Sequence, residues 1–312
     1  MATLYIDKEN IELKYDNHTL VIYKDNQLLN RIPLIAINRL FIYGDIDISS
    51  KLINNLADKK IGIVFIGGRN KEPKMFFNSP HNDARIRINQ YKCSLDNQFC
   101  IEFSQRLIQD KINTQINLLS KYQVAYSYRK MDQDSIIEKL KQNLLKVPEF
   151  TSKPQIMGSE GYSSSLFFSG LKNIFPLEIM FKSRNRRPPK DPVNSMLSLG
   201  YTLLIYEAVL EIYARGLDPF IGFLHEIDFG RESLACDVIE PLRFIIEELV
   251  LKLIIEKKIN EDLFYYEANE ACLMGKTARK IFYKEYSQIE EKIRFTLSEY
   301  LDLIINILKA RE

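Results

Sequence analysis

The sequence predicts an α+β protein of two domains, in which a small amino-terminal β-sandwich-like domain precedes a larger all-α domain. Up to about residue 78, apolar residues form short segments that are rich in β-branched and aromatic side chains and are separated by turn-forming residues. From about Asn82 onward, apolar residues recur instead at spacings of three and four, which is typical of helices. A chain of 312 residues is long enough for two hydrophobic cores. We therefore expect domains at residues 1–78 and 79–312.

The first domain is expected to contain strands at TLYID, IELKY, TLVIYK and RLFIYG. Turn-forming residues at 16–18 (DNH) and 25–26 (DN) predict hairpin turns. Ser49 or Ser50 is expected to cap a short helix through KLINNLADKK, and the following IGIVFIGG predicts a buried strand.

The second domain is expected to consist of helices. Helical periodicity runs through IRINQYKCSL, FCIEFSQRLIQDKINTQINLLSKY and SIIEKLKQNLLKV, and four more helices are expected at residues 156–172, 191–214, 232–257 and 277–310. Asp191-Pro192 marks the start of one of them, because a capping side chain there precedes a proline at the first helical position.

Composition limits the possible classes of function. Lys and Arg number 43 and Asp and Glu 41, so any nucleic-acid surface has to be a local patch rather than a global excess of charge. The apolar runs are far shorter than the ~20 residues that span a bilayer, and the amino terminus lacks the pattern of a secretory signal. The four cysteines form no C-x-x-C pair, which suits a reducing compartment. We expect a soluble cytoplasmic protein.

One of the three histidines stands out. His225 ends the apolar stretch PFIGFLH, whereas His18 and His81 fall in expected loops. Taken alone, such a histidine is more often a structural residue than a metal ligand. Twelve residues later, Asp237 and Glu240 stand three positions apart among apolar neighbours. Two like charges in that place need a cation or a basic group close by.

Two interpretations of these acids stay open on residues alone. Arg243 could neutralise the pair, and Asp237 could simply favour the positive amino-terminal end of its helix. A third acid, Glu160, lies between Gly158 and Gly161, which allow close approach of a metal or a phosphate. One imidazole with two or three carboxylates suits Mn²⁺ or Mg²⁺ better than Zn²⁺.

A basic loop is the strongest electrostatic feature of the sequence. FKSRNRRPPKDP carries five positive charges without an acid between residues 182 and 190, which is typical of phosphate binding. Its basic residues are Lys182, Arg184, Arg186, Arg187 and Lys190. A second basic cluster follows at helical spacing and is also typical of an ordinary solvated helix face; it comprises Lys276, Arg279, Lys280 and Lys284.

These pieces occur in an order that resembles a known family. MGSEGYSSSLFFSG, RNRRPPKDPVNSMLSLGYTLL and GLDPFIGFLHEIDFGRESLACDVIEPLRF are similar to three motifs of the CRISPR-associated integrases, the larger of the two universal spacer-acquisition proteins. The amino-terminal LYIDKENIELKYDNHTLVIYKDNQLL and the segment GDIDISSKLINNLADKKIGIVFI also resemble that family's β-domain, so the similarity covers essentially the whole chain.

The resemblance implies a catalytic metal site in the helical domain. It places the ligands of Mn²⁺ or Mg²⁺ on Glu160, His225 and Glu240, and gives Asp237 a catalytic role outside the ligand set. Asn194 and Tyr201 match the family's D-P-V-N…G-Y stretch beside the site. Glutamate at 240 and Cys236 are small departures from the family pattern. The residues expected to bind DNA are Lys182, Arg184, Arg186, Arg187, Lys190, Asn194, Tyr201, Arg243, Lys276 and Arg279.

The resemblance also implies partners and a reaction. The β-rich domain would serve dimerisation, and two homodimers would be bridged by a small second adaptation protein. The expected reaction joins 3′-hydroxyl ends of short DNA fragments to a repeat array by transesterification, on double-stranded and branched DNA. A non-catalytic DNA-binding protein and a plain hydrolytic DNA nuclease remain the alternatives.

Overall fold

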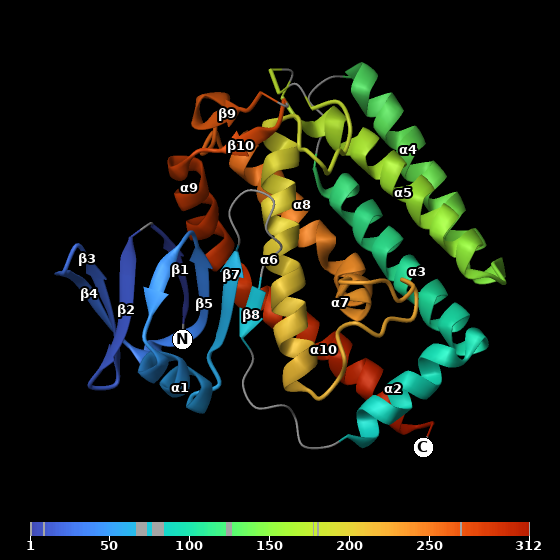
Figure 1. Cartoon of the computed structure of the whole chain (residues 1–312). Coiled ribbons are helices and arrows are strands. Elements are labelled where there is room, and N and C mark those ends of the chain that lie inside the picture. The colour runs from blue at the N-terminus through green and yellow to red at the C-terminus, as the bar shows by residue number, and fades with distance from the viewer. Residues whose placement is uncertain are drawn as a thin grey trace. The chain divides into compact units, whose positions relative to one another are not determined.

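The computed structural model describes residues 2–8, 10–66, 74–76, 84–122, 127–176, 178–179, 181–268 and 270–311. The chain divides into two compact units, Met1–Asn82 and Asp83–Glu312. Strands prevail in the first unit and helices in the second, as expected (Figure 1). The division falls close to the predicted boundary at residue 78, in a segment that lies outside the described residues together with His81.

The first unit contains two four-stranded sheets. One has the order β1-β5-β7-β8, with β1 and β7 parallel to β5 and with β8 antiparallel to β7; its strands are β1 (Ala2–Asp7), β5 (Ile37–Tyr43), β7 (Gly62–Ile66) and β8 (Lys74–Phe76). The other has the order β4-β3-β2-β6; its strands are β4 (Gln27–Pro33), β3 (Thr19–Lys24), β2 (Ile11–Asp16) and β6 (Ile46–Ile48).

Two tight hairpins join β2 to β3 and β3 to β4, and both confirm predicted turns. Asn17 and His18 form the first two-residue loop, and Asp25 and Asn26 form the second. All four residues have φ between 43° and 61°, the left-handed values that such hairpin loops require and that Asn and Asp tolerate well.

A short helix and both sheets share one hydrophobic core. Helix α1 (Ser50–Asp58) begins as expected at Ser49, whose hydroxyl accepts the Leu52 N–H at 3.3 Å. The core combines side chains of both sheets with those of α1, including Leu13, Leu20, Leu40, Leu52 and Leu56. Apolar burial of this kind is the main force that stabilises the unit.

The second unit is mostly helical, and the prediction that it is all-α is wrong at one place. Besides α7 (Ser233–Ile239) and α8 (Arg243–Ile255), which are described below, its helices are α2 (Arg85–Leu95), α3 (Asn97–Lys121), α4 (Ser127–Lys146), α5 (Lys153–Ile174), α6 (Pro192–Ala214), α9 (Lys276–Ser287) and α10 (Glu290–Lys309). Residues Phe264–Tyr266 (β9) and Cys272–Met274 (β10) pair as a short antiparallel hairpin. Each strand has only three residues, too few to show a period of two in the sequence.

The helix expected at 232–257 is interrupted in the middle. It consists of α7 (Ser233–Ile239), a 3-10 turn at Glu240–Leu242, and α8 (Arg243–Ile255). Pro241 explains the interruption, because it has no N–H to donate to the carbonyl of Asp237 four residues earlier. Glu240 is the first residue of this turn and precedes Pro241 directly.

Helix α6 runs through the core of the second unit (Figure 1). Asp191 caps it by accepting the Asn194 N–H at 2.8 Å, which confirms the predicted start. The helix is long and apolar enough to cross a membrane, but 72% of its apolar window is buried inside the protein, as in a core helix of a soluble protein. Helix α3 packs against α5, α8 and the 3-10 turn, and this contact assembles the site.

Candidate active site

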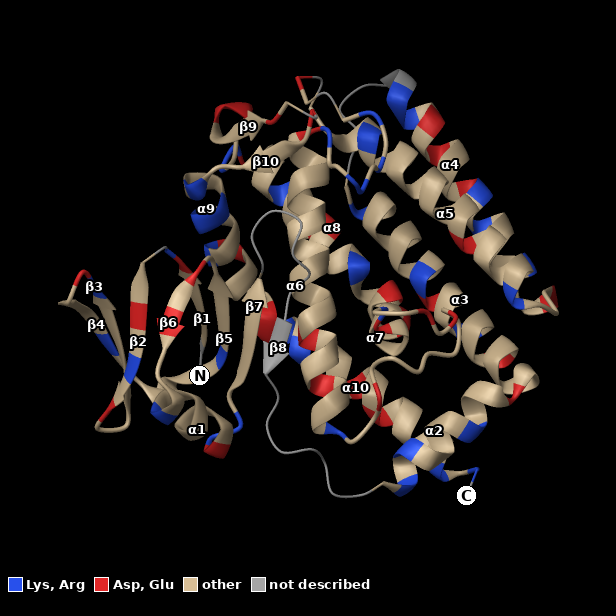
Figure 2. Ribbon diagram, in the orientation of Figure 1, with Lys and Arg blue, Asp and Glu red and all other residues tan. Residues whose placement is uncertain are grey.

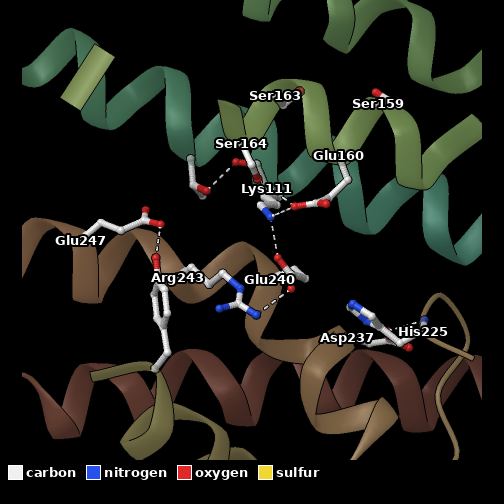
Figure 3. Close-up of polar contacts among 12 residues, drawn as sticks. Lys111, Ser159, Glu160, Ser163, Ser164, His225, Asp237, Glu240, Arg243 and Glu247 are labelled. Carbon is white, nitrogen blue, oxygen red and sulfur yellow. Dashed lines mark hydrogen bonds and ion pairs between the residues drawn. The ribbon is translucent and has the colours of Figure 1, made fainter. Parts of the chain in front are cut away.

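Two of the three predicted metal ligands meet at a cation that no sequence pattern singled out. The ammonium Nζ of Lys111 forms ion pairs with Oε1 of Glu160 and, at 2.6 Å, with Oε2 of Glu240 (Figure 3). The three side chains come from α3, α5 and the 3-10 turn, respectively. Ser164, one turn after Glu160, donates its hydroxyl to the same Oε1 at 2.8 Å.

The burial pattern of α3 explains where Lys111 points. Leu107, Ile108, Ile112 and Leu118 form the buried stripe of this helix, and Lys111 lies within the stripe at 4% exposure. A lysine is almost never this buried unless its charge is paired. The signal in the sequence was therefore a lysine at a core-facing position of an amphipathic helix.

Opposite charges keep Lys111 and Glu240 ionised. Burial alone would lower the pKa of Lys111, but the charges of Glu240 and Glu160 outweigh it and raise that pKa. Burial alone would raise the pKa of Glu240, but the charges of Arg243 and Lys111 hold it well below its ordinary value. Arg243 approaches from the other side, with Nη2 at 2.9 Å from Oε1 of Glu240. Arg243, offered above as a neutralising group for both acids of the pair, thus pairs with Glu240, whereas Asp237 has other partners.

His225 and Asp237 form a second cluster. Oδ2 of Asp237 accepts the N–H groups of Phe223 and Leu224 at 2.6 and 3.0 Å, and Oδ1 accepts the N–H of His225 at 2.9 Å. Nδ1 of His225 lies 2.7 Å from Oδ1 of Asp237. A Cβ on Gly222 would stand 2.8 Å from Oδ2, so glycine is needed for the loop to wrap this closely around the carboxylate.

The two acids expected on one helix face thus have different partners. Asp237 is fully buried and serves the loop that carries His225, whereas Glu240 faces Lys111 and Arg243. Figure 3 shows the imidazole of His225 on the same side of the site as Glu240, with its edge turned toward the space beside the two glutamates. Because Nδ1 is engaged by Asp237, Nε2 is the nitrogen that remains for a ligand.

The donor atoms of these residues suit a divalent cation, but the residues are not arranged around one. Among the described residues, no group of three His, Cys, Asp or Glu side chains is arranged to hold a metal ion. Glu160 and Glu240 nevertheless already direct one oxygen each at a single positive charge. Carboxylate oxygens with one imidazole are donors that Mn²⁺ and Mg²⁺ accept.

A cavity of about 360 Å³ opens beside the carboxylate cluster. Its lining includes Glu160 and Gly161 together with five basic side chains, which are Lys111, Lys182, Arg184, Arg186 and Arg243. A Cβ on Gly161 would meet nothing within 4 Å, so open space adjoins this glycine next to Glu160. The concentration of positive charge suits an anion such as a phosphodiester.

Tyr201 forms one wall of the cavity. Two guanidinium groups contact its ring, with Cζ of Arg184 at 5.4 Å and Cζ of Arg243 at 4.7 Å from the ring centre. Its hydroxyl donates to Oε1 of Glu247 at 2.6 Å. Burial raises the pKa of Glu247 to about 7, against the opposing effect of this hydrogen bond. Within the described part of the chain, Oε2 of Glu247 has no hydrogen-bond partner.

The basic loop divides into exposed and structural members. Lys182, Arg186 and Arg187 are exposed, and Lys190 is exposed with Nζ at 3.5 Å from Oε2 of Glu270. Arg184 is half-buried and donates to Oδ1 of Asn194 at 2.8 Å.

Asn194 was expected to contact DNA and instead holds the basic loop. It is fully buried, accepts from the N–H of Asn185 at 3.0 Å, and donates to Oδ2 of Asp191 at 2.6 Å and to the carbonyl of Ser183 at 2.9 Å. Its hydrogen-bonding capacity is used inside the protein, so it positions the loop rather than meeting a ligand.

The second basic cluster is connected to the loop through β10. Cys272, the first residue of β10, donates its N–H to the carbonyl of Pro189 at 2.8 Å, and α9 follows β10 directly. Lys276 is exposed at the start of α9, whereas Arg279 donates to the Met274 carbonyl at 2.8 Å. Figure 2 shows the positive residues of α9 and those of the loop region near β10.

Comparisons with known proteins agree with this architecture. The family model for CRISPR associated protein Cas1 matches residues 4–288. A curated relative, the CRISPR-associated endonuclease Cas1 1 of Thermodesulfovibrio yellowstonii, is 37% identical over 291 residues, which cover 92% of this chain and 91% of the relative.

Solved structures share the fold. A Cas1 protein from Thermotoga maritima matches with a TM-score of 0.85 at 24% identity and covers 99% of this chain and 97% of its own. A casposase bound to integration product matches with a TM-score of 0.84 at 22% identity, over 100% of this chain and 92% of its own. A Cas6-RT-Cas1–Cas2 complex gives 0.82 at 22% identity, over 99% of this chain and 35% of the other.

Proposed function

This chain belongs to the Cas1 family of CRISPR-associated proteins, and on that premise we propose that it is a metal-dependent DNA integrase and endonuclease of CRISPR adaptation. Its curated relative is named an endonuclease, and the casposase that shares its fold was captured with an integration product. Both activities break or exchange phosphodiester bonds, so one site can serve them.

The observation that carries the proposal is the convergence of Glu160 and Glu240 on a single positive charge, beside a cavity lined with basic side chains. Glu160, Glu240 and Nε2 of His225 would hold Mn²⁺ or Mg²⁺. Such an ion supplies Lewis-acid stabilisation of the charge that develops on a phosphoryl group.

The remaining residues have positioning and binding roles. Asp237 orients the imidazole of His225, and Arg243 orients the carboxylate of Glu240. The exposed members of the basic loop, with Lys276, would hold DNA phosphates, and Asn194 would keep that loop in place.

The nucleophile decides between joining and cutting. When the 3′-hydroxyl oxygen of a DNA fragment attacks a backbone phosphorus, one phosphodiester bond forms and another breaks. The leaving 3′-oxygen takes up a proton as the attacking hydroxyl loses one. Water in the same place gives hydrolysis. We assign joining as the main reaction, on double-stranded and branched DNA.

The assembly follows from the same family membership. We assign dimerisation to the first unit and propose that it is sandwich-like, which its two sheets and their shared core support. A small Cas2-type protein is the expected second partner, because a chain that shares the fold of this protein belongs to a Cas6-RT-Cas1–Cas2 complex. These partners would operate in the cytoplasm.

The test measures strand joining and cleavage on a branched DNA with Mn²⁺. We expect wild type to join strands, and Glu160→Gln, His225→Ala and Glu240→Gln to lose both joining and cleavage. Glu299→Gln, an exposed glutamate on α10, is the control with the same change of charge and should match wild type. Binding without any reaction of the wild type would favour a non-catalytic DNA-binding protein, and cleavage without joining would favour a plain nuclease.

A further inference from the structure

We propose that Lys111 is a counter-cation that makes metal occupancy of the site depend on bound DNA. In the site without a divalent ion, its ammonium holds Glu160 and Glu240 together. When a divalent ion takes the two carboxylates, the ammonium is released toward the adjoining cavity, where a DNA phosphate becomes its partner. This inference rests on the proposed metal-dependent function.

The direct ion pairs of the cluster are balanced in charge. Two carboxylates, of Glu160 and Glu240, face two cations, Lys111 and Arg243. The side chains of Lys111 and Glu240 are each 5% exposed, so water screens their charges weakly. A divalent ion added to this balanced cluster would leave an excess of two positive charges in a poorly screened place. We therefore expect the ion alone to bind weakly.

Lys111 also lies at the wall of the cavity. Lys111 and Glu160 both line it, together with Arg184, Arg186 and Arg243. The flexible four-carbon stem of a lysine lets its ammonium turn from the carboxylates to the cavity while the backbone of α3 stays in place. A phosphodiester in the cavity would offset the added positive charge and would accept hydrogen bonds from the displaced ammonium.

Thermodynamic linkage makes the effects of DNA and of the divalent ion on each other's binding reciprocal. If DNA tightens the binding of the divalent ion by some factor, the ion tightens DNA binding by the same factor. Lys111 thus sets the size of this coupling. A site that binds the divalent ion only when DNA is bound would also limit the hydrolysis of phosphodiesters that do not bind in the cavity.

A purely structural role of Lys111 makes the opposite prediction. If the lysine only fastens α3 to α5, its removal would loosen Glu160 and Glu240 and weaken the binding of a divalent ion. If it competes for the carboxylates, its removal would strengthen that binding. The direction of the change in metal affinity therefore separates the two roles.

The experiment measures Mn²⁺ affinity by electron paramagnetic resonance of the free ion, on the full chain. Wild type is compared with Lys111→Met, Lys111→Arg and Lys121→Met, each without DNA and with a branched DNA whose strands end in 2′,3′-dideoxyribose and so lack the 3′-hydroxyl nucleophile. Lys121 is the matched control, because it lies on the same helix and also pairs with a glutamate, Glu248, at 2.6 Å.

Without DNA, we expect Lys111→Met to bind Mn²⁺ about tenfold more tightly than wild type, and DNA to tighten wild-type binding by a similar factor. The DNA effect should shrink in Lys111→Met, whereas Lys111→Arg, which keeps the charge, and Lys121→Met should resemble wild type. Equal or weaker Mn²⁺ binding by folded Lys111→Met overturns the proposal.

Two further measurements of Mn²⁺ binding test the coupling and the metal site separately. If Lys111→Met does not fold without metal, wild-type Mn²⁺ affinity that is the same with and without DNA overturns the proposal by itself. If Mn²⁺ binding by wild type persists in Glu160→Gln and Glu240→Gln, the metal site itself is misassigned and the proposed function falls with it. Equal Mn²⁺ binding by wild type and folded Lys111→Met, lost in those two variants, would overturn the coupling alone.

Discussion

Asp237 holds His225 at two points: Oδ1 accepts its backbone N–H at 2.9 Å and lies 2.7 Å from Nδ1 of its imidazole. The carboxylate therefore fixes both the loop that carries the histidine and the direction of the ring. An acid in this place favours the tautomer with the proton on Nδ1 and leaves Nε2 as the acceptor. The role of Asp237 in the site is thus inseparable from its role in folding the loop.

Asp237→Ala should destabilise the protein strongly. It would leave the N–H groups of Phe223, Leu224 and His225 without their acceptor, and lost partners of this kind give a cost of about 3 kcal/mol or more. The free energy of unfolding in urea measures the effect. Asp228→Ala removes an exposed carboxylate that accepts one N–H in the same loop and should cost about 1 kcal/mol or less. Equal stability of the two variants would contradict this assignment.

Two glycines should respond in opposite ways to alanine. In Gly222→Ala the new Cβ would lie 2.8 Å from Oδ2 of Asp237 and 2.8 Å from the backbone of Ser233, a clash expected to cost about 1–3 kcal/mol. In Gly158→Ala the Cβ would meet nothing within 4 Å, and an exposed helical site should gain about 0.5–1 kcal/mol. Thermal unfolding of both variants gives the signs; a stable Gly222→Ala would show that the loop is not wrapped this tightly.

Local signals made much of the fold predictable from the sequence. The cap at Ser49, the cap at Asp191 and both hairpin turns depend on residues within a few positions of one another. The same holds for the change from strands to helices along the chain. Such features are set by backbone preferences and by side chains that bond to nearby N–H groups.

The arrangement of the site was not predictable in this way. The contact of Lys111 with Glu240 joins residues 129 positions apart, and Asp237 and Glu240 have separate partners although they lie three positions apart. The sequence showed a pair of acids that needed a cation and offered Arg243 for it. It did not show that a second cation would come from another helix, because that contact depends on packing between α3 and the 3-10 turn.

Glu247 should give the protein a stability that falls as the pH rises. Its pKa is raised from 4.5 to about 7 by burial, next to Tyr201, Glu240, Lys111 and Arg243. An acid with a raised pKa in the folded state contributes stability that is fully present below pH 4.5 and is lost as the pH rises through about 7. The loss is on the order of 3 kcal/mol between these limits.

Glu247→Gln isolates this effect, because glutamine can still accept the hydrogen bond of Tyr201 but does not titrate. Unfolding in urea is measured from about pH 4 to about pH 8 for both proteins. We expect the difference in free energy of unfolding to move in favour of Glu247→Gln as the pH rises, with most of the change between about 4.5 and 7. A difference that is independent of pH would mean that Glu247 keeps an ordinary pKa.

The exposed arginines of the basic loop should contribute to DNA affinity through phosphate contacts. Arg186→Ala with Arg187→Ala removes two exposed charges and leaves the Arg184–Asn194 hydrogen bond intact. We expect weaker binding at every DNA sequence and a slope of log affinity against log salt that is shallower by about 1–2 units. Fluorescence anisotropy at several salt concentrations measures both. The control, Lys139→Ala with Lys141→Ala, removes two exposed charges from α4 and should leave the slope unchanged. If both pairs change the slope equally, general electrostatics rather than this loop determines binding.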